Sequence, residues 1–286
     1  MITVGIVGLG VIGGSLAKAF TSNGVRVLGT DISEKTMKAA FADGAIAGEF
    51  DEENIRECHM VMLAVPSPAA IKWIKTNAYL LHQSQLVVDC CGTKRAICEI
   101  GFDLMKETEL NFVGGHPMAG FNLDGYENSR ADMFNKACFV LCQKKEDTFQ
   151  KNMLCHLLSF AGFKNIAFMT PEAHDKTIAY TSQLSHIVPS ALINSGSATF
   201  GNVPIAGGSF RDMTRVANLN EVAWTALCME NRDNLIDEIN SFIHELFQYR
   251  DALISRNAVK LKELFAMGSE NKQRFDDLSD INAKGV

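Results

Sequence analysis

Three glycines and one acid near the start of the chain have the spacing of a dinucleotide-binding turn. An apolar run, Val4–Val7, leads directly into Gly8-x-Gly10-x-x-Gly13, and a helical pattern and a second apolar run then end on Asp31. Gly8 permits the tight turn, Gly10 lets the backbone approach a pyrophosphate, and Gly13 lets the helix pack closely on the strand. The free N–H groups at the helix N-terminus would bind the phosphates.

The acid also indicates which dinucleotide binds. The Asp31 carboxylate would accept hydrogen bonds from the adenosine ribose and would repel the 2′-phosphate of NADP. Ile32-Ser33 offers no arginine in compensation, although Lys35 is close. We therefore predict NAD as the cofactor. Besides the glycines and Asp31, we expect its site to include Val11, Ile12, Val65 and Pro66.

His116, in VGGHPMAG, is placed to act as a base. It follows the predicted strand Asn111–Gly114, and the neighbouring glycines and Pro117 predict a non-helical loop at the carboxyl edge of the sheet. A neutral imidazole, with its ordinary pKa of about 6.5, would accept the proton of an alcohol while the carbon loses hydride to NAD+. The alternative is a loop histidine that only bonds the backbone.

Two further sets of side chains have the chemistry to bind a substrate. His186 shares a polar helical stripe with Ser182 and Ser185, although spacing alone favours a histidine satisfied within the core. Arg211 and Arg215 lie four residues apart, so on a helix they share a face. A guanidinium binds carboxylates in a bidentate manner, and a solvated helix face is the alternative.

Strands and helices alternate from Met1 to about Phe168, which predicts a mostly parallel, doubly wound α/β sheet, a Rossmann domain over residues 1–168. In such sheets ligands bind beyond the carboxyl ends of the strands, so Pro66, Asp89–Lys94 and Gly114–Gly120 should converge on one crevice. The predicted strands are Val4–Val7, Val25–Thr30, Met60–Val65, Leu86–Asp89, Asn111–Gly114, Phe139–Leu141 and Asn165–Phe168, and the helices include Ser15–Thr21, Glu34–Ala42 and Ala69–Asn77.

Residues 169–286 show only helical periodicity, which predicts an all-helical domain. Its long apolar faces predict dimerisation, and the candidate residues His186 and Arg215 make it the expected substrate-binding domain. We do not expect His174-Asp175 to be catalytic, because an acid so near the start of a helix is explained by its favourable interaction with the helix dipole. We expect the polar tail beyond Asp276 to fray. The periodic segments are Ala173–Ser195, Glu221–Ala252 and Asn257–Met267.

The composition excludes several classes of protein. A chain of 286 residues that is 47% hydrophobic is long enough for two domains with their own cores. A net charge of −6 disfavours nucleic acid as a partner, and no apolar run is long enough to span a membrane. The first strand begins at once, without a basic leader, so we predict a cytoplasmic protein. Its eight cysteines lack paired CxxC spacing and are expected to be reduced thiols, with no metal bound.

In this order the motifs resemble the prephenate dehydrogenase family of tyrosine biosynthesis. The resemblance covers nearly the whole chain and rests on GLGVIGGSLA, HPMAG, PEAHDK, TSQLSH, FRDMTRVA and AWTALCMENRDNL. It implies NAD+-dependent oxidation of prephenate, a cyclohexadienol with a ring carboxylate and a pyruvyl side chain. Carbon dioxide leaves and the ring becomes aromatic, which gives 4-hydroxyphenylpyruvate.

The resemblance also implies roles for individual residues. His116 matches the catalytic histidine that accepts the proton of the ring hydroxyl. His186 matches a histidine at the side-chain end of the substrate, and Arg215 matches the arginine that holds a substrate carboxylate. The family motif D-x-G-S-x-K reads DCCGTK here, with Gly92 at the serine position, and either Thr93 or a water is the expected substitute.

Two other departures concern the substrate. Gln183 stands where the family has the first histidine of S-H-L-P-H, and we expect it to bind substrate. Phe121–Asp124 replaces a Ser-Glu-Lys-Ser type segment. Arogenate, which carries an amine in place of the side-chain ketone, is therefore an alternative substrate, with Asp124 pairing its ammonium.

Two other classes of protein compete with this assignment. A β-hydroxyacid-type dehydrogenase would use a lysine near the start of the helical domain, such as Lys176. A non-catalytic NAD sensor would need only the glycine turn. His116 in its HPMAG loop disfavours the first, and the joint presence of His116, His186 and Arg215 disfavours the second.

Overall fold

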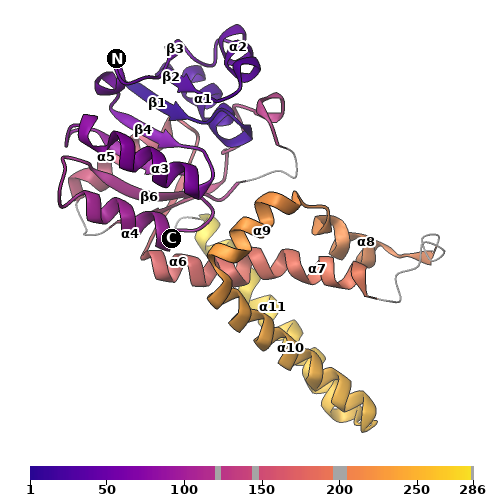
Figure 1. The fold of residues 1–286 in the computed structure, drawn as a ribbon. Helices are drawn as coiled ribbons and strands as arrows, with labels where there is room; N and C mark the ends of the chain where they lie inside the picture. The colour runs from indigo at the N-terminus through magenta and orange to yellow at the C-terminus, as the bar shows by residue number, and fades with distance from the viewer. Residues whose placement is uncertain (120–123, 144–147, 196–204, 285–286) are drawn as a thin grey trace. The chain divides into compact units, whose positions relative to one another are not determined.

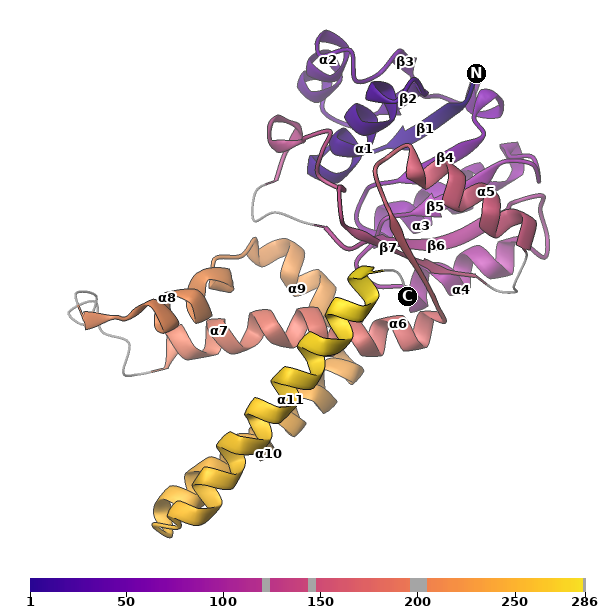
Figure 2. The same cartoon turned by 180° about the vertical axis from the view of Figure 1, so that it is seen from behind.

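A single mixed sheet organises the first part of the chain. The computed structural model describes residues 1–119, 124–143, 148–195 and 205–284. Within them, eight strands follow the order β3-β2-β1-β4-β5-β6-β7-β8 (Figures 1 and 2), and all pairs are parallel except β6 with β7. The predicted mostly parallel, doubly wound sheet is confirmed. The strands are β1 (Thr3–Val7), β2 (Arg26–Thr30), β3 (Gly48–Glu49), β4 (Met60–Leu63), β5 (Leu86–Asp89), β6 (Phe112–Pro117), β7 (Cys138–Cys142) and β8 (Asn165–Met169).

Helices cover both faces of the sheet, because central parallel strands are apolar on both sides. One apolar core joins the sheet to α1, α2 and α5 and contains Leu16, Phe20 and Leu158. A second core, on the α3 and α4 side, contains Ile74 and Ile97. The covering helices are α1 (Val11–Ser22), α2 (Glu34–Ala42), α3 (Ser67–Asn77), α4 (Arg95–Leu104) and α5 (Thr148–Ser159).

The main differences from the sequence prediction concern two strands. The two-residue edge strand β3 is absent from it, because so short a segment has no periodicity. Strand β6 continues past Gly114 to Pro117, since Gly115 and His116 pair antiparallel with Leu141 and Val140 of β7. The expectation that His116 lies in a loop is therefore wrong, and a strand fixes its backbone.

The helical part begins at Pro171, directly after β8. Thr170 caps the first helix, where its hydroxyl oxygen accepts the N–H of Ala173 at 3.2 Å. The predicted helix over Ala173–Ser195 is continuous but contains a π-helical segment. The elements are α6 (Pro171–Ile178), the π segment η4 (Ala179–Leu184), α7 (Ser185–Asn194), α8 (Gly208–Thr214), the 3-10 turn η6 (Arg215–Ala217), α9 (Glu221–Glu230), α10 (Arg232–Ile254) and α11 (Ala258–Lys284). Other 3-10 turns are η1 (Ile55–Glu57), η2 (Ala78–Leu80) and η3 (Tyr126–Asn128).

The chain separates into two compact units, Met1–Arg232 and Asp233–Val286. In the second unit the Tyr249 hydroxyl donates to the carbonyl of Leu264 at 3.3 Å, which joins α10 to α11. Helix α11 continues to Lys284 and includes i,i+4 pairs such as Gln273 with Asp277, so the polar tail beyond Asp276 is helical. Among the described residues, no helix combines the length and the apolar character needed to cross a membrane.

Candidate active site

The glycine turn has the backbone geometry that a dinucleotide requires. Gly8 has a φ of +85°, and a Cβ there would lie 2.6 Å from the carbonyl oxygen of Ala64. A Cβ on Gly13 would lie 1.8 Å from the carbonyl oxygen of Gly8, so only glycine lets α1 approach β1 this closely. At Gly10, by contrast, no described atom beyond the neighbouring residues of the chain lies within 4 Å of the Cβ position. That open space fits the close approach of a pyrophosphate.

The surroundings of the turn also suit a nucleotide. Gly10 caps α1 without a side-chain hydrogen bond, so the first N–H groups of this helix have no side-chain acceptor from the cap. The Asp31 carboxylate lies at the end of β2, where it accepts the N–H of Leu9 at 2.7 Å and the N–H of Ser33 at 2.8 Å. Val65 lies directly against Gly8, and Pro66 caps α3.

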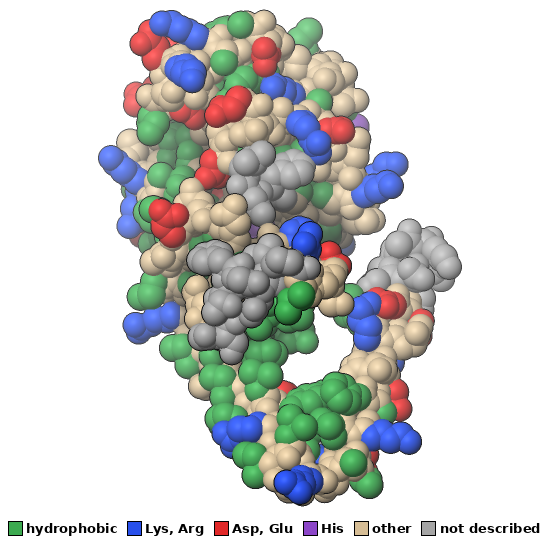
Figure 3. All heavy atoms as spheres, turned by 90° about the vertical axis from the view of Figure 1, so that its right-hand side faces the viewer, with side chains coloured by type: hydrophobic (Ala, Val, Ile, Leu, Met, Phe, Trp, Pro, Cys, Tyr) green, Lys and Arg blue, Asp and Glu red, His purple; other side chains and the backbone are tan. Residues whose placement is uncertain are grey.

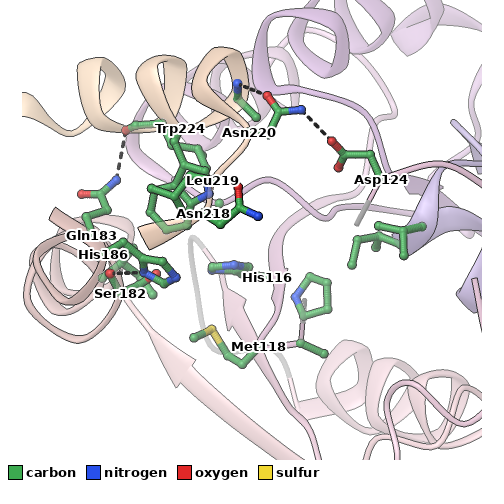
Figure 4. A pocket seen from close by; sticks show the side chains of 18 residues that line it. His116, Met118, Asp124, Ser182, Gln183, His186, Asn218, Leu219, Asn220 and Trp224 are labelled. Atoms are coloured by element: carbon green, nitrogen blue, oxygen red, sulfur yellow. Dashed lines mark hydrogen bonds between the residues drawn. The ribbon is translucent and has the colours of Figure 1, made fainter. Parts of the chain in front are cut away.

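A cavity of about 440 Å³ joins this turn to the helical segments of the first unit. Val11 and Ile12 line it from the start of α1, and His116, Gln183 and His186 line it from β6, η4 and α7. The volume suits a small-molecule ligand. Figure 4 shows the imidazoles of His116 and His186 projecting into this pocket. Its other walls include Met118, Asp124, Ser182, Asn218, Leu219, Asn220 and Trp224.

A buried ion pair holds the strand that carries His116. The Asp89 carboxylate accepts the N–H of Gly115 at 2.9 Å and the N–H of Cys91 at 2.9 Å, and it pairs with the Lys94 ammonium. Lys94 also donates to the carbonyl of Gly115 at 2.6 Å. Burial alone would lower the pKa of Lys94, but the Asp89 carboxylate raises it above the ordinary value, so the ammonium stays charged. Gly115 is thus held on both sides, one residue before His116.

His116 begins a hydrogen-bonded chain of three side chains. His116 Nδ1 lies 2.9 Å from His174 Nε2, and His174 Nδ1 lies 2.8 Å from Asp175 Oδ1. His174 and Asp175 are buried at the start of α6. Desolvation, the Lys94 ammonium and His174 lower the pKa of His116 well below 6.5, which outweighs the opposing effect of Asp175. His116 is therefore neutral at pH 7, as a base must be.

Sequence reasoning missed the position of His174 and Asp175, because it assigned the acid only to the helix dipole. The available signal was the histidine-acid pair itself, since an acid commonly fixes the tautomer of a neighbouring histidine.

His186 has a defined place in the cavity wall. Its Nδ1 lies 2.8 Å from the carbonyl oxygen of Ser182, and its ring stacks on Trp224 with centroids 4.1 Å apart. Arg215, in contrast, is exposed and is not among the described residues that line the cavity. Its short turn η6 ends one residue before the lining residue Asn218.

The other substituted positions have protein partners. Gln183 donates from Nε2 to the carbonyl of Leu227 at 3.0 Å and accepts from Asn231 at 2.8 Å. Thr93 is buried, and its hydroxyl donates to Glu230. A Cβ on Gly92 would lie 2.7 Å from a methyl carbon of Leu227, so this leucine occupies the space of a side chain at that position. The predicted substrate contacts of Thr93 and Gln183 would thus compete with these bonds.

The loop after HPMAG is described only in part. Gly120 and Phe121–Leu123 lie outside the described residues. Asp124 lines the cavity and accepts a hydrogen bond from Asn220 at 2.6 Å (Figure 4). Lys176 is exposed and does not line this cavity. The β-hydroxyacid interpretation required Lys176 to act in the active site, and the position of Lys176 outside the cavity disfavours it.

Two family models match the chain. One, described as "Prephenate dehydrogenase, nucleotide-binding domain", matches residues 16–166, and one described as "Prephenate dehydrogenase, dimerization domain" matches residues 170–267. Among curated proteins, a prephenate dehydrogenase of Bacillus subtilis is 29% identical over 92% of this chain and 73% of its own length.

Solved structures agree with these matches. A prephenate dehydrogenase from A. aeolicus, in complex with hydroxyphenyl propionate and NAD+, has a TM-score of 0.83 at 26% identity, over 96% of this chain and 98% of that one. An arogenate dehydrogenase from Synechocystis has a TM-score of 0.80 at 26% identity, over 96% of this chain and 100% of that one.

Proposed function

Because the chain belongs to the prephenate dehydrogenase family, we propose that it catalyses the NAD+-dependent oxidative decarboxylation of prephenate to 4-hydroxyphenylpyruvate, a step of tyrosine biosynthesis. The observation that carries the proposal is the shared cavity. Val11 and Ile12 of the dinucleotide turn and the neutral imidazole of His116 line the same space. A substrate hydroxyl in that space is within reach of both the base and a cofactor seated on the turn.

The reaction balances without net release of a proton. The ring carbon that bears the hydroxyl loses hydride, the quaternary carbon loses carbon dioxide, and the ring becomes aromatic. His116 takes the hydroxyl proton as the carbon–oxygen bond gains double-bond character, and the proton returns to the phenolate oxygen after decarboxylation. Removing the proton favours hydride loss, because it places electron density on the oxygen of the carbinol.

NAD is the cofactor that fits the residues present. Gly8, Gly10 and Gly13 would form its pyrophosphate turn, with Val11 and Ile12 at the phosphates and Asp31 at the ribose. Val65 and Pro66 border the same turn. When bound, NAD+ supplies the hydride acceptor. The part played by the protein is to orient the substrate, keep water out and hold the hydroxyl proton at His116.

The substrate carries two carboxylates; we assign one of them to Arg215, and we place the side-chain end of the substrate at His186. Among the described residues that line the cavity, Asp124 is the only one with a formal charge. A dianion therefore needs a cation from the border of the cavity, and Arg215 is close in sequence to the wall at Asn218. A strong hold on the departing carboxylate would also stabilise the ground state, so Arg215 serves mainly as an anchor. The family matches favour prephenate over arogenate.

The remaining assignments concern the whole chain. We propose that residues 1–168 bind NAD, and that residues 169–286 bind substrate and form a homodimer, as the dimerization-domain match supports. A cytoplasmic location and the lack of a nucleic-acid partner stay predictions from composition.

The test is the rate of NADH formation, followed at 340 nm, with each of prephenate and arogenate against each of NAD+ and NADP+. We expect prephenate with NAD+ to give the highest kcat/KM of the four pairs. Absence of turnover with both substrates would overturn the proposal and favour a non-catalytic NAD sensor.

A further inference from the structure

We propose that His174 and Asp175 are positioning residues that hold His116 as the tautomer with its proton on Nδ1 and its lone pair on Nε2. This inference rests on the proposed function, in which His116 is the base, and it assigns a role to two side chains outside the cavity wall.

The hydrogen bonds determine the tautomers in sequence. The Asp175 carboxylate only accepts, so His174 Nδ1, 2.8 Å away, must carry a proton. In a neutral ring His174 Nε2 then has the lone pair. His116 Nδ1 lies 2.9 Å from that nitrogen, so it must donate. Nε2 of His116 therefore has its lone pair free for the proton of a substrate hydroxyl. The opposite tautomer would place a proton where the base needs an acceptor.

Asp175 is held ionised by the start of α4. Its carboxylate accepts the N–H of Lys94 at 2.7 Å, the N–H of Arg95 at 3.0 Å and Nε of Arg95 at 3.3 Å. Burial alone would raise the pKa of Asp175, but the hydrogen bond from His174 and those from the backbone N–H groups of Arg95 and Lys94 lower it below the ordinary value. Both carboxylate oxygens thus meet the N-terminus of a helix, where a negative charge is favoured. An ionised Asp175 accepts the His174 hydrogen bond at any pH near neutral.

The arrangement also supports the charge that develops on His116. Once Nε2 takes the hydroxyl proton, the ring is a cation close to the Lys94 ammonium, whose charge is already paired with Asp89. Asp175, one imidazole away, supplies a carboxylate whose charge opposes the effect of the Lys94 ammonium on the new cation. No proton has to reach Asp175, because the low pKa of that carboxyl keeps it an acceptor.

This chain has few other means of orienting His116. Gly92 has no side chain, and Leu227 fills the adjoining space. Among the described residues, no other side chain hydrogen-bonds the His116 ring. The orientation that fixes the base therefore comes from behind the strand, through α6, and not from the loop after β5.

Nitrogen-15 NMR of the wild-type protein with labelled histidine tests the tautomer directly, without substrate. The His116 signals are identified by their loss in His116→Asn. We expect a protonated Nδ1 and an unprotonated Nε2. A proton on Nε2 of His116 would overturn the inference. This measurement needs no His174 variant to fold, and its result does not depend on which substrate the enzyme uses.

Kinetics of two variants then test the role. In His174→Phe, which cannot accept from Nδ1, we expect kcat to fall about 10- to 100-fold while the KM for NAD+ changes less than twofold. In His174→Gln the side-chain carbonyl can accept from Nδ1, so most of kcat should return and the tautomer should be restored. His82→Gln, an exposed histidine outside the site, is the matched control. A folded His174→Phe protein that retains kcat within twofold would contradict the proposal.

Discussion

His116 gains its chemical role from its neighbours more than from its own side chain. Lys94 and burial keep the imidazole neutral, His174 determines which nitrogen is free, and Asp89 holds the backbone one residue earlier. A base of this kind is effective when the pH lies above the pKa of its conjugate acid. The position of that pKa is therefore measurable in the kinetics.

The first prediction concerns pH. Desolvation, Lys94 and His174 lower the pKa of His116, so the base stays unprotonated in mild acid. We expect kcat/KM for prephenate to hold its plateau below pH 6.5 and to fall only as pH drops through the lowered pKa. The measurement is a pH–rate profile with saturating NAD+. An acid limb centred at or above 6.5 would contradict the environment described for His116.

The second prediction concerns the substrate anchor. A charge-assisted hydrogen bond to a carboxylate contributes about 1.5–3 kcal/mol, so Arg215→Met should raise the KM for prephenate about 10- to 100-fold. The KM for NAD+ should not change. Arg211→Met removes an equally exposed arginine one helical turn earlier and is the control. Equal effects of the two substitutions would show that Arg215 has no specific contact.

At the scale of elements, the site depends on how α6 meets α4. The Asp175 carboxylate accepts hydrogen bonds from the two backbone N–H groups at the start of α4. Asn231 donates to the backbone carbonyl of Asp175 at 2.7 Å, and Arg95 donates to the side chain of Asn231 at 3.1 Å. One buried carboxylate thus joins the sheet part of the chain to the helical segments that follow it within the first unit.

The third prediction follows from this junction. Asp175→Asn leaves one amide oxygen for two N–H groups, so the free energy of unfolding should fall by about 1–3 kcal/mol. Because the pKa of Asp175 is lowered in the folded state, its contribution is present above the unfolded-state pKa and is lost as pH falls through the folded-state pKa. Urea unfolding at pH 7 and at a pH below 3.8 measures both effects. An Asn variant as stable as the wild type at pH 7 would contradict this function of Asp175.

The elements that could be predicted are those with strong local patterns. The glycine turn and the buried strands β1, β4 and β5 follow from runs of residues adjacent in sequence. The extension of β6 through His116 could not be predicted, because it depends on pairing with β7, more than twenty residues later. Gln183 and Thr93 donate hydrogen bonds to Leu227 and Glu230, respectively. These partners are distant in sequence, so no local pattern predicts the contacts.

At the scale of the whole molecule, the second unit exposes large apolar side chains on both of its helices. Figure 3 shows hydrophobic side chains gathered on the surface of the helical part. On α10 and α11 large apolar side chains lie exposed, among them Ile243, Leu246, Phe247, Val259 and Phe265. Exposed apolar surface of this kind marks an interface, and the dimerization-domain match covers these residues.

The fourth prediction is that the protein sediments as a dimer and that Leu246→Glu together with Phe247→Glu shifts it toward monomer. A buried glutamate in an apolar interface costs several kcal/mol, so the dissociation constant should rise at least about 100-fold. Lys262→Glu, on the same unit, changes charge without removing apolar surface and is the control. A wild-type monomer at micromolar concentration would contradict the proposed dimer.

The central claim is that His116 takes the hydroxyl proton of prephenate beside NAD+, and one comparison tests it most directly. It is the rate of NADH formation from saturating prephenate and NAD+ by the wild type and by His116→Asn, with Lys176→Ala as control. We predict that kcat falls about 10²- to 10⁴-fold in His116→Asn, with folding intact, and hardly changes in Lys176→Ala. A His116→Asn enzyme with wild-type kcat would contradict the account.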